Sequence, residues 1–96
     1  LSRQARHFPI TPEVLIRPDE RGQLYLMFVS AADRPGLLYS VARVLANHRI
    51  NLHTAKIATL GDRVEDNFLI SGAVLARNNN VIRIEQEVLK ELQVPA

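Results

Sequence analysis

The chain of 96 residues contains no cysteine and only five aromatic residues. Without cysteine it cannot form a disulfide framework, a thiolate zinc site or an iron–sulfur cluster, and it has no cysteine nucleophile. This absence fits a cytoplasmic location. The aromatic residues are too few for a platform on which nucleic-acid bases stack, so they are expected to fill the core. They are Phe8, Tyr25, Phe28, Tyr39 and Phe68.

Long apolar runs are also missing. No run reaches the roughly 18–20 residues that cross a bilayer, and the first residues lack the hydrophobic stretch of a signal peptide. We therefore expect no membrane partner. Because the chain begins with Leu1 rather than Met, we expect it to be a fragment of a longer protein.

Positive charge is not concentrated in the part expected to fold, although the formal net charge is +2. Arg3 and Arg6 precede the first acidic residue, Glu13, and without them the acidic and basic residues are equal in number. The remaining arginines are scattered, whereas nucleic-acid binding depends on clustered cations that face phosphates. Nucleic acid is therefore not expected as a partner.

The spacing of apolar residues divides the chain into a leader and one domain. Residues 1–12 contain Pro9 and Pro12 and show no period, which indicates a leader or linker. Residues 13–94 are expected to form the domain. It begins with a short β-branched strand at 13–17 and an apolar strand at 24–32, which is expected to be buried on both faces; the turn between them predicts a hairpin.

A helix is predicted after this hairpin. Asp33 is a candidate N-cap, Pro35 lies near the first helical position, and the helix is expected to end near residues 47–49. Its apolar stripe is expected at positions i, i+3, i+4 and i+7, which are Leu38, Val41, Ala42 and Leu45.

Two more strands and a second helix complete the domain. The apolar residues of segment 50–60 change face near Thr54, which predicts a bulge. Gly61 and Asp62 form a hairpin turn before a strand at 64–71. Candidate caps for the last helix are Asn78, Asn79 and Asn80. Its apolar stripe is Val81, Ile84, Val88 and Leu92.

The resulting order, ββαββα, predicts an α+β fold. We expect a ferredoxin-like sandwich, with a four-stranded antiparallel sheet and two helices on one face. The usual ferredoxin-like order ends in a strand that lies beside the first one, and no strand is predicted after the last helix here. The strand at 13–17 is expected to fill that edge, because a hairpin strand pairs antiparallel with its neighbour.

No combination of residues predicts catalysis or a metal site. The histidines lack the spacing of a helical zinc pair and are expected at the surface or at helix ends. The candidate hydroxyl nucleophiles lack a predicted histidine neighbour with an orienting acid. These residues are His7, His48, His53, Ser30, Thr54 and Ser71.

Asp66 differs from the other acidic residues of the second hairpin. It shares the parity of Phe68 and Ile70 and is therefore expected to point toward the helices, whereas Asp62 and Glu65 are expected to be solvated. A buried carboxylate needs a partner. We expect a structural salt bridge, with contact to a ligand as the alternative.

The junction between the apolar strand and the first helix is the segment best suited to binding. A helix N-terminus presents unpaired N–H groups and partial positive charge, and Gly36 lets a carboxylate or phosphate approach the backbone. Arg34 adds charge, while Asp33 either caps the helix or receives a ligand ammonium group. The alternative is a capped loop with no ligand. The glycine spacing matches neither a Walker loop nor a dinucleotide fingerprint, so a nucleotide is disfavoured.

These residues resemble a known family. The motif Asp33-Arg34-Pro35-Gly36-Leu37-Leu38, followed after the helix by Ile50-Asn51-Leu52, resembles the ACT domain, a ferredoxin-like regulatory module that binds amino acids. The resemblance covers residues 24–92. Segment 55–70, with Gly61-Asp62-Arg63-Val64-Glu65-Asp66 at its centre, is similar to the closing ACT domain of the bifunctional enzymes that attach uridylyl groups to PII nitrogen-signalling proteins and remove them. Plant ACT-repeat proteins share a similar stretch.

The resemblance implies a glutamine sensor without catalytic residues or metal of its own. It implies catalytic domains elsewhere that use Mg²⁺ and act on PII, and a pocket completed by a second ACT domain or by a homodimer. The implied ligand-binding residues are Asp33, Arg34, Pro35, Gly36, Leu37, Leu38 and Asn51. Three alternatives remain: a ligand-free dimerisation module, an ACT-repeat protein with another amino-acid ligand, and a small enzyme or RNA binder on the same scaffold.

Overall fold

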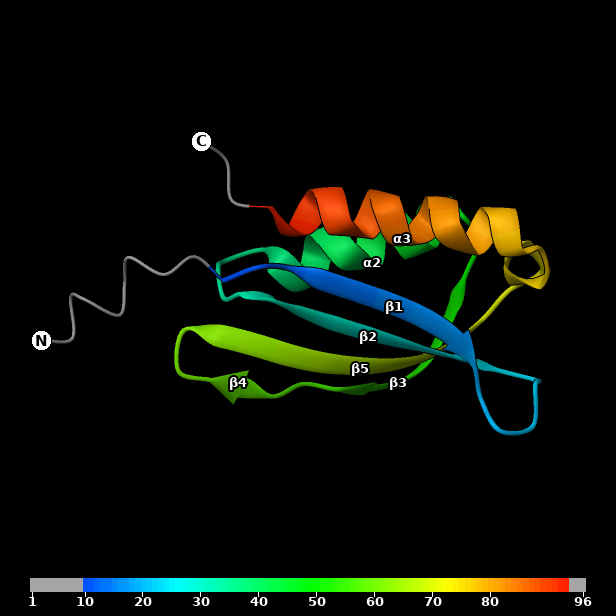
Figure 1. Ribbon diagram of the computed structural model, residues 1–96, viewed down its shortest axis with the longest axis horizontal. Coiled ribbons are helices and arrows are strands. Elements are labelled where there is room, and N and C mark those ends of the chain that lie inside the picture. The colour runs from blue at the N-terminus through cyan, green and yellow to red at the C-terminus, as the bar shows by residue number, and fades with distance from the viewer. Residues whose placement is uncertain (1–9, 94–96) are drawn as a thin grey trace, which may run out of the picture.

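The computed structural model describes residues 10–93, which form an antiparallel sheet with two helices on one of its faces (Figure 1). The predicted ferredoxin-like architecture is confirmed. Residues 1–9 and 94–96, including most of the expected leader, lie outside the described residues. The elements are β1 (Glu13–Pro18), β2 (Tyr25–Ala32), α2 (Leu37–Asn47), β3 (Asn51–Lys56), β4 (Thr59–Leu60), β5 (Arg63–Ser71), η1 (Ala73–Ala76) and α3 (Asn78–Leu92).

The sheet has four strand positions in the order β1-β2-β5-β3. The short β4 is an additional strand, and it pairs with β5 beyond the end of β3. The prediction that the first strand fills an edge is confirmed, because β1 pairs only with β2. The predicted bulge is also confirmed: the register of β3 against β5 shifts between Leu52 and Thr54.

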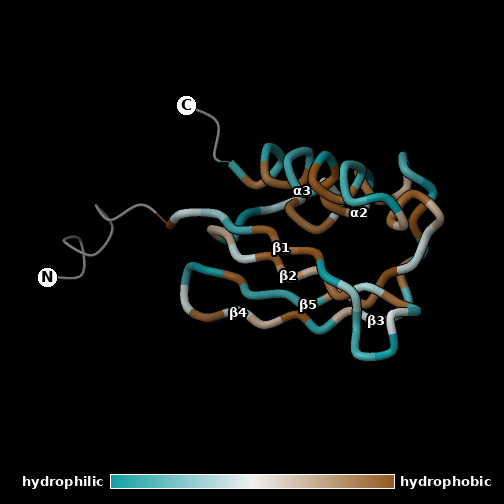
Figure 2. The backbone as a smooth tube through the Cα atoms, turned by 45° about the vertical axis from the view of Figure 1, so that its right-hand side comes forward, coloured by the Kyte–Doolittle hydropathy of each residue, from teal (hydrophilic) through white to brown (hydrophobic). Residues whose placement is uncertain are grey.

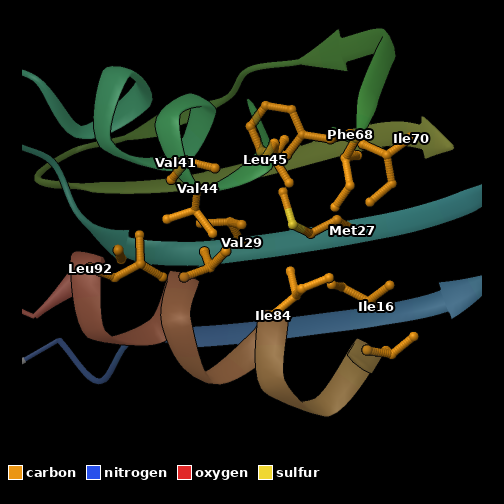
Figure 3. Close-up of a cluster of buried hydrophobic side chains, with 14 of the residues drawn as sticks. Ile16, Met27, Val29, Val41, Val44, Leu45, Phe68, Ile70, Ile84 and Leu92 are labelled. Atoms are coloured by element: carbon orange, nitrogen blue, oxygen red, sulfur yellow. The ribbon is translucent and has the colours of Figure 1, made fainter. Parts of the chain in front are cut away.

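The core lies between the sheet and the two helices (Figure 3). Alternate residues of β2 and β5 enter it, as the period of a strand requires. The predicted stripe of α3 is confirmed, since Val81, Ile84, Val88 and Leu92 are all buried. The opposite face of the sheet is open, and the tip of the β1–β2 hairpin is hydrophilic (Figure 2).

Three predictions about burial are wrong. Tyr39 was expected in the core, but it is 70% exposed. The buried residues of α2 are Leu37, Val41, Val44 and Leu45, whereas Leu38 and Ala42 are exposed. Both sets fit a helical period, and they share Val41 and Leu45. Which set is buried therefore depends on the side of the helix that faces the sheet, and the spacing alone does not determine it. The second strand is not buried on both faces, because the helices cover only one face and Leu26 is exposed on the other.

The predicted helix caps are also wrong. In residues 10–93 no side chain caps α2: the N-cap position is occupied by Gly36, and Asp33 lies three residues before it. Asn78, Asn79 and Asn80 lie in the first turn of α3, whose N-cap position is Arg77. The short helix η1, in which Leu75 is buried, was not predicted. In the described part of the chain, neither α2 nor α3 is long and apolar enough to cross a membrane.

Candidate functional site

A cavity of about 290 Å³ lies at the N-terminus of α2, against β4 and the adjoining end of β5. Five of the seven predicted ligand-binding residues line it, and Pro35 and Asn51 do not. Its other walls come from the first turn of α2, the break between β3 and β4, and β5. The lining residues are Asp33, Arg34, Gly36, Leu37, Leu38, Tyr39, Ile57, Thr59, Val64 and Asp66.

The first turn of α2 presents unpaired N–H groups. Gly36 has a φ of 81°, a left-handed conformation that turns the chain into the helix and suits glycine. The N–H of Leu37 donates to the Arg34 carbonyl at 3.3 Å. Among the described residues, no partner accepts a hydrogen bond from the N–H groups of Leu38 and Tyr39. A helix N-terminus in this condition favours an anion such as a carboxylate.

Asp66 is the most deeply buried charged side chain in the cavity wall, with 1% of its surface exposed. Its Oδ1 accepts a hydrogen bond from the N–H of Ala58 at 3.2 Å. Burial raises the pKa of Asp66, the Ala58 hydrogen bond lowers it in part, and the negative charge of Asp33 raises it further. The predicted position of this carboxylate is confirmed. The predicted salt bridge is wrong for the described residues, where its partner is a main-chain N–H.

Arg34 connects this junction to the other helix. Its Nη2 donates to the carbonyl of Glu91, near the C-terminal end of α3, while its Nε is buried without a partner among the described residues. The N–H of Asp33 donates to the Asp62 carbonyl at 2.9 Å, which joins the junction to the turn between β4 and β5. The first contact anchors the junction to α3, and the second joins it to the β4–β5 turn, whose strands form the opposite wall of the cavity.

Asn51 lies away from the cavity of its own chain. It begins β3, opposite Ser71 at the end of β5, and it follows the C-terminal end of α2. The 11 residues of α2 separate the two ends of the helix by about 16 Å. The structure therefore does not bring Asn51 together with the other predicted site residues.

Residues at the β3–β4 break and at the start of β4 line the cavity but were not predicted as site residues. Ile57 and Thr59 lie in a segment that was expected to be one continuous strand. Tyr39 also went unassigned to the site, although it directly follows the predicted motif. The parity of Asp66 with Phe68 predicted that this carboxylate would point toward the helices. It did not predict that the hydrogen-bond partner of the carboxylate would be a main-chain N–H.

Among the described residues, one histidine and one hydroxyl group lie within hydrogen-bonding distance of each other. No cluster of three potential metal ligands occurs among residues 10–93. The Nε2 of His53, which lies at the bulge, is 2.7 Å from the Ser71 Oγ. This exposed pair has no carboxylate partner in the described part of the chain. It therefore lacks the orienting acid of a triad.

Replacement of Asp66 by asparagine is expected to increase stability at neutral pH. A carboxyl group with a raised pKa in the folded state favours folding at low pH, and this contribution is lost as the pH rises through that pKa. Asparagine retains an acceptor for Ala58 and carries no charge. The melting temperature of Asp66→Asn should exceed that of the unmodified chain at pH 7, and the difference should shrink toward pH 4. A less stable variant at pH 7 would contradict this assignment of the pKa shift.

Comparisons with known proteins identify the family. A model of the ACT domain matches residues 25–93. The chain is 61% identical over 94 residues to a bifunctional uridylyltransferase/uridylyl-removing enzyme from Burkholderia orbicola (strain MC0-3), and 59% identical over 95 residues to one from Cupriavidus metallidurans. Each alignment covers 98% of this chain and 11% of the relative. The chain therefore spans about a tenth of the length of these relatives.

A solved structure supports the same fold. A protein of unknown function from Galdieria sulphuraria superposes with a TM-score of 0.58 at 23% identity, over 73% of this chain and 38% of the other. At this identity the likeness concerns the fold alone. The family match covers most of the chain and includes both the helix junction and Asp66. The chain belongs to the ACT domain family.

Proposed function

We propose that this chain is a regulatory module that binds an amino acid, and that the ligand is glutamine. The observation that carries the proposal is the uncapped N-terminus of α2, whose free Leu38 and Tyr39 N–H groups lie beside a cavity of about 290 Å³. These groups suit an α-carboxylate. The cavity also contains Asp33 and Asp66, which suit a positively charged group, so the site offers both kinds of contact that an amino acid requires.

Calorimetric titration of the purified chain with L-glutamine tests this proposal. We expect saturable heat with a dissociation constant of roughly 0.01–1 mM, the range suited to sensing a metabolite. D-glutamine and L-glutamate serve as controls and should bind at least tenfold more weakly. A trace without saturable heat through the millimolar range, or equal binding of both enantiomers, would contradict the proposal.

The proposal also concerns the longer protein to which this domain would belong. The similarity to uridylyltransferase/uridylyl-removing enzymes supports a role as the regulatory part of such an enzyme. We propose that its catalytic domains lie elsewhere in the longer protein and use Mg²⁺. We propose PII as the substrate of that enzyme and the cytoplasm as its location. Glutamine at the ACT domain would shift the balance between attachment and removal of the uridylyl group.

Association with a second ACT domain is favoured by the edge of the sheet. Every residue of β3 is exposed, and within the described part of the chain β3 pairs with β5 alone. Large apolar side chains lie exposed along this edge, on the neighbouring β3–β4 segment and in the first turn of α2: Leu38, Leu52, Ile57 and Leu60. An edge of this kind favours pairing with another chain. A ligand-free dimerisation module is therefore the second candidate function.

Sedimentation velocity over a range of concentrations tests this association, with and without L-glutamine. A dimer that forms equally in both conditions, together with a flat calorimetric trace, supports the second candidate. A monomer at every concentration excludes self-association through the β3 edge. A dimer that tightens with glutamine supports both binding and pairing.

A further inference from the structure

The carboxylate of Asp66 has one oxygen that the fold does not use. Oδ1 accepts the N–H of Ala58, whereas Oδ2 has no hydrogen-bond partner among the described residues. The side chain is 99% buried and forms part of the cavity wall. A buried carboxylate with a single neutral donor is poorly compensated for the hydration that it loses.

We propose that Asp66 recognises a cationic nitrogen in this cavity, the α-ammonium group of the bound amino acid. This inference rests on the proposed function and assigns a specific role to a residue outside the helix junction. The unpaired N–H groups of Leu38 and Tyr39 receive the ligand carboxylate, and Asp66 receives the ammonium group. The two ends of a zwitterion are thereby bound by different elements, α2 and β5.

None of the positively charged side chains in the described residues forms an ion pair that would neutralise Asp66. Among the described residues that line the cavity, Arg34 is the only cationic one, and its Nη2 donates to the carbonyl of Glu91. No ion pair among the described residues involves Asp66. A ligand ammonium group supplies both the missing donor and the missing charge.

A purely structural role does not explain the negative charge. The hydrogen bond from Ala58 needs only a neutral acceptor, which asparagine would provide without the desolvation cost of a carboxylate. The negative charge of Asp33 adds to the cost of ionising Asp66. The carboxylate therefore reduces stability at neutral pH in the empty site, and a bound cation would remove that cost.

The inference is tested by measuring the affinity of three proteins for each of two ligands. The ligands are L-glutamine and 4-carbamoylbutanoate, which keeps the carboxylate and the terminal amide of glutamine but lacks its amino group. The proteins are the unmodified chain, Asp66→Asn and Asp62→Asn. Asp62 lies exposed in the β4–β5 turn and does not line the cavity, so it is a control with the same change of charge.

We expect Asp66→Asn to weaken L-glutamine binding at least tenfold and to change the binding of 4-carbamoylbutanoate less than twofold. Asp62→Asn should leave both affinities unchanged. Equal weakening of both ligands in Asp66→Asn, or no weakening of either, would overturn the role of Asp66 while the proposed function stands. An unmodified chain that binds neither ligand would overturn the proposed function and this inference with it. Circular dichroism spectra of the variants establish that each one is folded.

Discussion

Replacement of Ile84 by alanine is expected to lower the free energy of unfolding by about 2–5 kcal/mol. Ile84 is 0% exposed and lies on the face of α3 that packs against the sheet, near Met27 and Ile16 (Figure 3). Truncation removes buried methyl and methylene groups and leaves a cavity that a sheet held by pairing on both sides of β2 cannot close easily. Urea denaturation followed by circular dichroism measures the loss.

Ile82 provides a matched control on the same helix. It is 44% exposed, so Ile82→Ala removes the same atoms from a site that is already partly hydrated. Alanine also has the higher helix propensity, and we expect a change of no more than about 0.5–1 kcal/mol in either direction. Equal losses in the two variants would show that α3 does not pack as described.

The two helices show how far spacing alone determines burial. In α3 most of the apolar residues form one stripe, with Ile82 and Leu89 outside it, and the period identified the buried face correctly. In α2 the apolar residues cover a wider arc that includes both Leu37 and Leu38. Which part of that arc is buried depends on the position of the sheet, and this is a tertiary property that the period of one helix does not contain.

The candidate site likewise has one part that the sequence predicted and one part that it did not. The helix junction was predictable because glycine and proline act locally on the backbone, and the resemblance to the ACT family pointed to the same segment. The opposite wall depends on the break between β3 and β4, where the N–H of Ala58 donates a hydrogen bond to Asp66. No local pattern marks this break, because residues 50–60 are consistently strand-like. The placement of Asn51 came from the family resemblance, and the fold of one chain does not bring it to the cavity.

Replacement of Gly36 by valine is expected to weaken L-glutamine binding about tenfold or more while the domain remains folded. Gly36 has a φ of 81°, and a left-handed conformation costs a residue with a side chain about 1–2 kcal/mol. An added Cβ would meet no atom within 4 Å, so the cost arises from the backbone and not from a clash. Rotation of residue 36 relieves the strain and turns the free N–H groups of Leu38 and Tyr39 away from the cavity. Each 1.4 kcal/mol that favours the rotated state lowers the apparent affinity tenfold. Calorimetry with L-glutamine measures the effect.

Gly22→Val separates the loss of binding from the loss of stability. Gly22 has a φ of 70°, and an added Cβ there would also meet no atom within 4 Å. It lies in the β1–β2 hairpin, at the opposite end of β2 from Gly36. Both variants should therefore lose a similar amount of stability, about 1–2 kcal/mol, in urea denaturation. Only Gly36→Val should lose affinity for L-glutamine, because only that glycine sets the direction of the N–H groups at the start of α2. If both variants bind L-glutamine equally, the N-terminus of α2 does not hold the ligand, and the binding site must lie elsewhere on the domain.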